Sequence, residues 1–163
     1  MFTRLVRPAA ATLALILLCP WIARGQTASQ TLTFQVNAIN QIAFVGAPAL
    51  TITTAAAGSA PTSVTNATAS WAVTTNQSGA KITGSIATAM PAGLTLSVNL
   101  SAPAGATSAS YQALGVTATD LVTGITKVGQ ASLGVLYKLD ATAAAGVVTS
   151  ASRVVTYTIT GGT

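Results

Sequence analysis

Apolar residues alternate with polar or small residues along most of this chain, and that period-two pattern limits the possible folds more than any other feature. Successive side chains of a β-strand point to opposite faces, so the pattern predicts strands with one apolar and one polar face. We count eight such runs, and a further short run at residues 41–46 raises the number of predicted strands to about nine. The other runs cover residues 31–38, 49–55, 69–76, 80–87, 93–102, 112–119, 132–142 and 153–161.

The stretches between these runs are rich in Gly, Pro, Ala and Ser, which is typical of turns. Residues 74–81, "TTNQSGAK", predict a hairpin in which Gly79 adopts a positive φ. Strands with one apolar face build antiparallel sheets that bury that face, and two such sheets pack into a sandwich. We therefore predict an all-β fold, a single antiparallel Ig-like β-sandwich of about eight strands.

The first 25 residues have the pattern of a secretory signal peptide. Arg4 and Arg7 precede an uncharged apolar stretch over residues 8–23, and Ala23 and Gly25 are small residues at the positions that a signal peptidase reads. We expect residues 1–25 to be removed and residues 26–163 to form the sandwich domain, exported to the periplasm, the cell surface or the medium. An uncleaved anchor and a lipoprotein lipidated at Cys19 are weaker alternatives.

Few ionisable groups remain after residue 25. Four cations oppose two carboxylates, which gives a net charge of about +2 and no basic patch, so we expect no nucleic-acid partner. We also expect no membrane span after cleavage, because the apolar stretch over residues 8–23 is removed with the signal peptide and is itself shorter than the ~20 residues that a spanning helix needs. The charged residues are Lys81, Lys127, Lys138, Arg153, Asp120 and Asp140.

The same residues argue against catalysis. The chain has no histidine, and its one cysteine lies in the predicted signal peptide, which excludes histidine- and thiol-based active sites from residues 26–163. Asp120 and Asp140 are far apart in the sequence and are typical of residues that close turns or end strands. We predict a protein that is not an enzyme and holds no cofactor or metal, with Lys138 and Asp140 paired on one strand face.

Ligand binding is a second possible function. A β-sandwich that binds carbohydrate would need exposed aromatic rings, and Tyr111 in the loop "SASYQAL" is the candidate exposed aromatic. Trp71 alternates with Val73 and is predicted to lie in the core. Asn66, Asn76 and Asn99 stand in Asn-x-Ser/Thr sequons, as expected by chance in a chain this rich in Ser and Thr.

A small outer-membrane β-barrel is the structural alternative, because exported strands of alternating polarity are also its signature. The six aromatic residues after residue 25 are too few for two interfacial girdles, and the C-terminal "TITGGT" does not end on an aromatic residue. These features favour the sandwich.

The alternating segment "QTLTFQVNAI" near the predicted mature start and the last strand "RVVTYTIT" resemble those of bacterial exported β-sandwich proteins of the pilin or fimbrial-subunit kind. The resemblance implies a non-catalytic structural or adhesive cell-surface protein whose partners are further copies of itself, other surface proteins or glycans. In such subunits an N-terminal strand can complete a neighbour's sheet. The chain lacks the cysteine pair that many pilins carry.

Leu32, Phe34 and Val36 make the apolar face of the candidate strand-addition segment. Their burial is worth about 1.5–3 kcal/mol each, so the segment is expected to be buried somewhere. Because about eight strands already close a sandwich, we expect insertion into the chain's own sheet rather than donation. A weakly charged, strand-rich chain is also expected to self-associate in a salt-insensitive manner.

Overall fold

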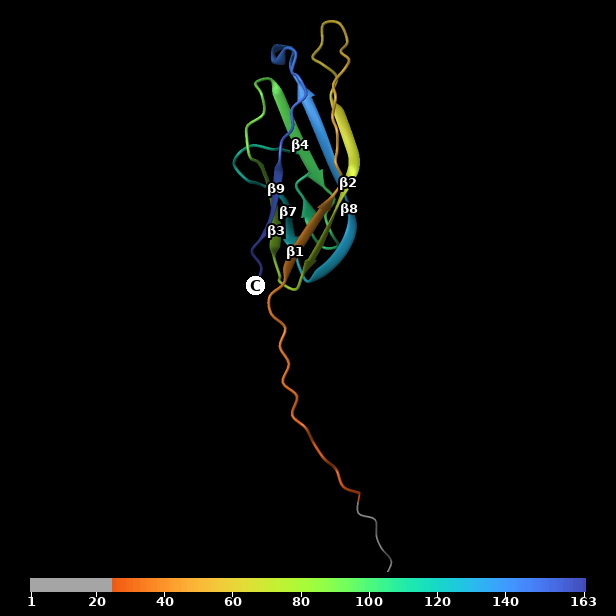
Figure 1. Ribbon diagram of the computed structural model, residues 1–163, viewed down its shortest axis with the longest axis vertical. Helices are drawn as coiled ribbons and strands as arrows, with labels where there is room; N and C mark the ends of the chain where they lie inside the picture. The colour runs from red at the N-terminus through yellow and green to blue at the C-terminus, as the bar shows by residue number, and fades with distance from the viewer. Residues whose placement is uncertain (1–24) are drawn as a thin grey trace, which may run out of the picture. The chain divides into compact units, whose positions relative to one another are not determined.

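The computed structural model describes residues 25–163, and the predicted signal peptide lies outside them except for Gly25. All the strands belong to one compact unit, residues 36–163. They form two separate antiparallel sheets, as the alternation predicted, and the two sheets do not join into one closed sheet (Figure 1). The five-stranded sheet contains, in spatial order, β1 (Asn40–Val45), β2 (Val64–Thr75), β8 (Val128–Ala141), β4 (Leu94–Leu100) and β6 (Gln112–Ala113). The four-stranded sheet contains β5 (Thr107–Ser108), β7 (Thr119–Ile125), β3 (Ala80–Ile86) and β9 (Val155–Thr160).

The core lies between the two sheets and is built from the inward-facing residues of the alternating runs. Trp71 is 1% exposed, and its indole N–H donates a hydrogen bond to the Ser101 carbonyl, so the prediction that it lies in the core is confirmed. Gly79 has φ 76°, as predicted, but β2 and β3 lie in different sheets, so the prediction that residues 74–81 form a hairpin was wrong: this turn carries the chain from one sheet to the other. The other fully buried core residues include Ile82, Val98, Leu100, Leu121, Val122, Ile125 and Val135.

The two sheets differ in length, and this difference shapes the molecule. In the five-stranded sheet β2 has 12 residues and β8 has 14, whereas β3, β7 and β9 of the other sheet have 6 or 7. One end of the longer sheet is therefore not covered by the shorter one. A single-turn 3₁₀ helix, η1 (Ala143–Ala145), follows β8 at that end. No helix in residues 25–163 is long and apolar enough to cross a membrane.

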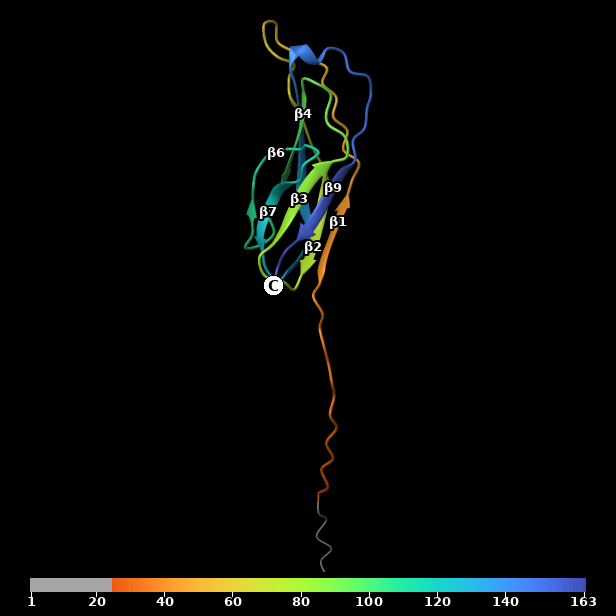
Figure 2. The same cartoon turned by 90° about the vertical axis from the view of Figure 1, so that its left-hand side faces the viewer.

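The two flanks of the sandwich are closed in different ways. On one flank the short β5–β6 connection joins the sheets, and main-chain bonds such as Ala109 N–H to Leu121 O secure it. On the other flank β1 pairs only with β2, and β9 pairs only with β3, within the described residues. Side chains alone bridge this flank, which we call the seam. Figure 2 shows β9 and β1 side by side there.

Two of the predicted strands are absent from the described sheets, so these predictions were wrong. Residues 31–38 belong to no strand, and Leu32, Phe34 and Val36 are 81%, 87% and 77% exposed. The expectation that this segment enters the chain's own sheet is therefore not met. Alternation shows that a segment can form a strand, but it does not show which edge will pair with it.

Residues 49–55 also form no strand, although the chain has just left β1. Gly46 has φ 116°, and a Cβ there would lie 2.9 Å from the Ala69 Cα of β2. The chain bends away at this glycine, and the Asn66 side chain, rather than a strand partner, donates a hydrogen bond to the Ala49 carbonyl. The predicted strand at 112–119 is likewise reduced to β6, because the chain leaves this sheet and starts β7 at Thr119.

Candidate functional site

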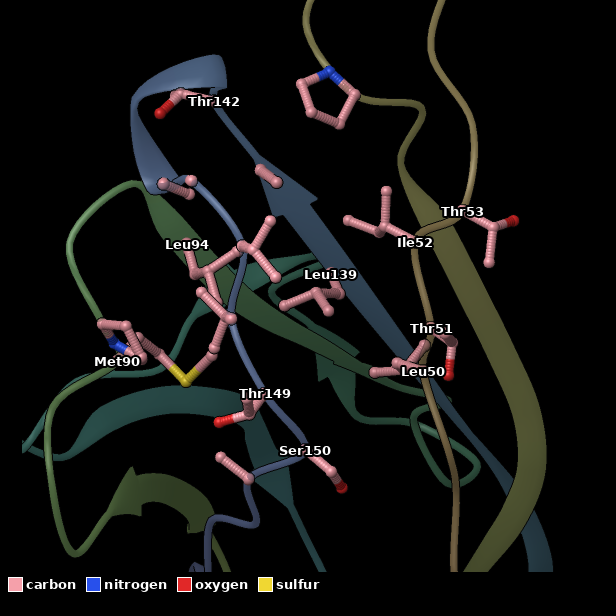
Figure 3. A pocket seen from close by; sticks show the side chains of 18 of the residues that line it. Leu50, Thr51, Ile52, Thr53, Met90, Leu94, Leu139, Thr142, Thr149 and Ser150 are labelled. Atoms are coloured by element: carbon pink, nitrogen blue, oxygen red, sulfur yellow. The ribbon is translucent and has the colours of Figure 1, made fainter.

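An apolar groove of about 710 Å³ lies at the end of the sandwich where the longer sheet is uncovered (Figure 3). Leu94 at the start of β4 and Leu139 near the end of β8 contribute its apolar floor, and both are half-buried. Met90 adds a flexible apolar side chain. These residues lie beside the core but are not covered by a second layer of strand.

Two segments outside the sheets form the walls of the groove. One wall comes from residues 50–55, which follow β1, and the other from residues 145–153, which lead into β9. Leu50 and Ile52 point into the groove, while Thr51 and Thr53 point away from it (Figure 3). This wall therefore has the side-chain alternation of a strand without belonging to a sheet.

The groove and the seam lie on the same flank, because one wall continues from β1 and the other runs into β9. Across the seam the Phe44 ring stacks on Tyr157, with centroids 3.8 Å apart and planes 8° apart. Phe44 also stacks on Trp71 at 5.8 Å. The inward-facing apolar residues of both edge strands, including Ile42 and Ile159, remain only half-buried. The seam is thus a place where the core reaches the surface.

Tyr157, one of the stacked rings, also pairs with Tyr137. The hydroxyls of Tyr137 on β8 and Tyr157 on β9 are 2.6 Å apart and share a hydrogen bond between the two sheets. Burial raises the pKa of Tyr137, and burial together with the bond to Tyr137 raises the pKa of Tyr157 above its usual range. Both hydroxyls therefore stay protonated and neutral near pH 7. This pair holds the β9 edge against the longer sheet by a polar contact inside an apolar region.

Four of the six charged residues after residue 25 form two separate pairs. Lys138 Nζ lies 2.9 Å from Asp140 on β8, as predicted, and the Ser63 hydroxyl also donates to Asp140. The bonds from Ser63 and Lys138 lower the pKa of that carboxyl. Asp120 pairs with Lys81 at 2.9 Å in the four-stranded sheet. The two aspartates thus lie in different sheets, and residues 25–163 contain no cluster of three or more acidic, His or Cys side chains that could hold a metal.

The other residues singled out from the sequence lie away from the groove. Tyr111, the candidate exposed aromatic, is 39% exposed and lies between β5 and β6, on the flank opposite the seam. The side-chain nitrogens of Asn66 and Asn76 donate to main-chain carbonyls, and Asn99 accepts a bond from Ser108. These three sequon residues therefore all take part in hydrogen bonds of the fold.

The strand-addition residues and the groove were found by different routes. Leu32, Phe34 and Val36 were identified from alternation, whereas the groove was missed because it depends on the unequal lengths of the two sheets. The alternation of Leu50 and Ile52 is the one sequence signal of a groove wall, although by itself this pattern predicts a paired strand. No protein-family model, curated protein or solved structure matches this chain.

Proposed function

We propose that this protein is an exported, non-catalytic structural subunit of the cell surface that joins to copies of itself by strand addition. In this proposal residues 31–38 of one copy form an extra strand in the groove and seam of the next copy. Repetition of this contact builds a chain of subunits, since every copy carries both a donor segment and a groove.

The observation that carries the proposal is that one chain presents both halves of such a joint. The donor segment exposes three large apolar side chains in alternation and belongs to no strand of the described sheets. The groove offers an apolar floor and two walls that no strand pairs with. Exposed strand-forming segments and unpaired edges are association sites, because main-chain groups and apolar side chains are both left without cover.

The donor segment matches in length the unpaired stretch that leads into the groove. The alternating donor segment has eight residues, and residues 46–54, which belong to no strand and lead into the groove wall, number nine. At about 3.3 Å per residue both spans are roughly 26–30 Å long. One inserted strand could therefore run the length of that segment and place its apolar face against the floor.

Burial of the donor side chains supplies enough free energy to drive insertion. Leu32, Phe34 and Val36 are each at least 77% exposed, so transfer into an apolar groove removes most of their surface from water. At about 1.5–3 kcal/mol each, the gross gain is about 5–9 kcal/mol before the cost of ordering the segment. Added main-chain hydrogen bonds to an unpaired wall would contribute about 0.5–1.5 kcal/mol each.

The groove gives less support to a carbohydrate-binding role. None of the described residues that line it is aromatic, so it offers no ring on which a sugar could stack. Tyr111 is a single half-exposed ring on the opposite flank. The lining is mostly aliphatic with several Thr and Ser residues, and it is better matched to the side chains of a peptide.

The test is a pair of substitutions on the two faces of the donor segment, in a chain from Gln26 to Thr163. Phe34→Asp places a charge on the apolar face, whereas Thr33→Asp places the same charge on the neighbouring polar face. Light scattering after size-exclusion chromatography should show multimers for the unaltered chain and for Thr33→Asp, but monomers for Phe34→Asp. Equal assembly of both variants would refute strand addition through this face.

A further inference from the structure

Asn76, in the turn between β2 and β3, holds the main chain of residues 37–39 through three hydrogen bonds. Its side-chain nitrogen donates to the Asn37 carbonyl at 2.8 Å, and its side-chain oxygen accepts from the Ile39 N–H at 2.8 Å. Its own N–H donates to the Ile39 carbonyl at 3.2 Å. We call this set of bonds the Asn76 clamp.

The clamp continues the pairing of β1 with β2 beyond the end of the sheet. The first residue of β1, Asn40, lies opposite Thr75, and the Thr75 hydroxyl donates to the Asn40 side chain at 2.6 Å. Asn76 then takes the next position along and holds Ile39 in line. The chain that leads from the donor segment into β1 is therefore fixed at residues 37–39 alongside the end of β2.

Self-insertion would require a different path at the same residues. The donor segment directly precedes β1, so it could lie beside β1 in the seam only by turning back through a tight hairpin. That hairpin would fall on residues 37–39, because the apolar alternation ends at Ala38 and β1 starts at Asn40. All three bonds of the clamp would break in the turn.

Donation to another copy carries no such requirement. Residues 31–36 of the donor segment, which carry Leu32, Phe34 and Val36, can enter the groove of a second copy while residues 37–39 of the first remain held by their own Asn76. We propose, on the basis of the strand-addition function above, that the Asn76 clamp is the positioning device that disfavours self-insertion and directs the segment to a neighbour. Asn76 thus decides between a closed monomer and a chain.

The experiment compares the chain from Gln26 to Thr163 with Asn76→Ala and with Asn99→Ala. Asn76→Ala removes both side-chain bonds of the clamp. Asn99→Ala is the matched control, since it removes the bond with Ser108, which joins β4 to β5, the edge strand on the opposite flank. The readouts are the monomer fraction at fixed concentration and, by hydrogen–deuterium exchange, the protection of the amides of Leu32, Phe34 and Val36 in the isolated monomer fraction.

We expect the amides of Leu32, Phe34 and Val36 to exchange freely in the unaltered monomer and in Asn99→Ala. In the Asn76→Ala monomer they should be protected, and the ratio of monomer to assembled chain should rise about tenfold, the factor expected from the loss of two hydrogen bonds. A fall in overall stability alone would not protect these amides. Asn76→Asp, which keeps the acceptor for Ile39 N–H, should give an intermediate ratio.

Two results would overturn the inference. One is protection of the amides of Leu32, Phe34 and Val36 in the unaltered monomer, which would show self-insertion in spite of the clamp. The other is an Asn76→Ala monomer in which the same three amides still exchange freely. Failure of the proposed function is seen separately: if the unaltered chain never assembles but Asn76→Ala still becomes protected, the clamp is upheld and strand addition between copies is not.

Discussion

Phe44→Ala should destabilise the isolated subunit, whereas Phe34→Ala should not. Phe44 is half-buried in the seam and stacks on both Tyr157 and Trp71. Phe34 is 87% exposed. The same substitution at these two positions therefore separates the contribution of the seam from that of the donor segment.

The expected magnitude follows from burial. Loss of a fully buried phenylalanine side chain costs about 3–5 kcal/mol, and a half-buried ring is expected to cost about half of that. The stacked pair with Tyr157 adds about 0.5–1.5 kcal/mol. Phe44→Ala should thus lower the free energy of unfolding by about 2–4 kcal/mol, while Phe34→Ala should change it by less than about 0.5 kcal/mol.

Urea denaturation of the chain from Gln26 to Thr163 measures both effects, at a concentration low enough to keep it monomeric. Trp71 is the only tryptophan after residue 25 and is buried, so its fluorescence reports on unfolding of the core. In assembled chains Phe34→Ala should promote dissociation into subunits more than Phe44→Ala does, because Phe34 lies in the donor segment. A Phe44→Ala midpoint equal to that of the unaltered monomer would refute the role of the stacked rings in closing the seam.

Two predictions concern pH. Because the pKa values of Tyr137 and Tyr157 are raised in the folded state, the unfolded state loses these protons first, and stability should fall as pH rises above about 10. Between pH 9 and 11 the urea midpoint should fall less in Tyr157→Phe than in the unaltered chain. Tyrosinate absorbance from this pair without unfolding would contradict the prediction. Ser63 and Lys138 lower the pKa of Asp140 below the ordinary 3.8, so the contribution of this carboxylate to folding stability is present above about pH 4 and is lost as pH falls through the folded pKa. The acid-induced drop in Tm should therefore be smaller in Asp140→Asn than in the unaltered chain. Equal drops would contradict this prediction.

The sequence predicted the fold class because the core depends on a local signal. Trp71 and Val73 alternate within one run, and the structure buries both. Side-chain alternation of this kind is a property of each strand alone, so it survives without knowledge of the partner strand. The Lys138–Asp140 pair was predictable for the same reason, since residues two apart on a strand share a face.

The features that make the candidate site could not be read in the same way. The groove exists because β8 is longer than β3 and β9. The Asn76 clamp joins Asn76 to Ile39 and Asn37, which are 37 and 39 positions away in the sequence. Neither has a local pattern. The donor segment was recognised as strand-forming, but the prediction of its own sheet as the partner was wrong, because alternation carries no information on which edge it will meet.

The most direct test of strand addition is complementation in trans. A chain of residues 36–163 keeps all nine strands of the described sheets and removes Leu32 and Phe34. Strand addition predicts that this short chain is monomeric and that a peptide of residues 27–39 binds it one to one with a Kd of about 100 µM or tighter. The bound peptide should slow amide exchange at residues 50–55, at residues 147–153 and along β9. Absence of binding, or protection confined to another flank, would contradict it.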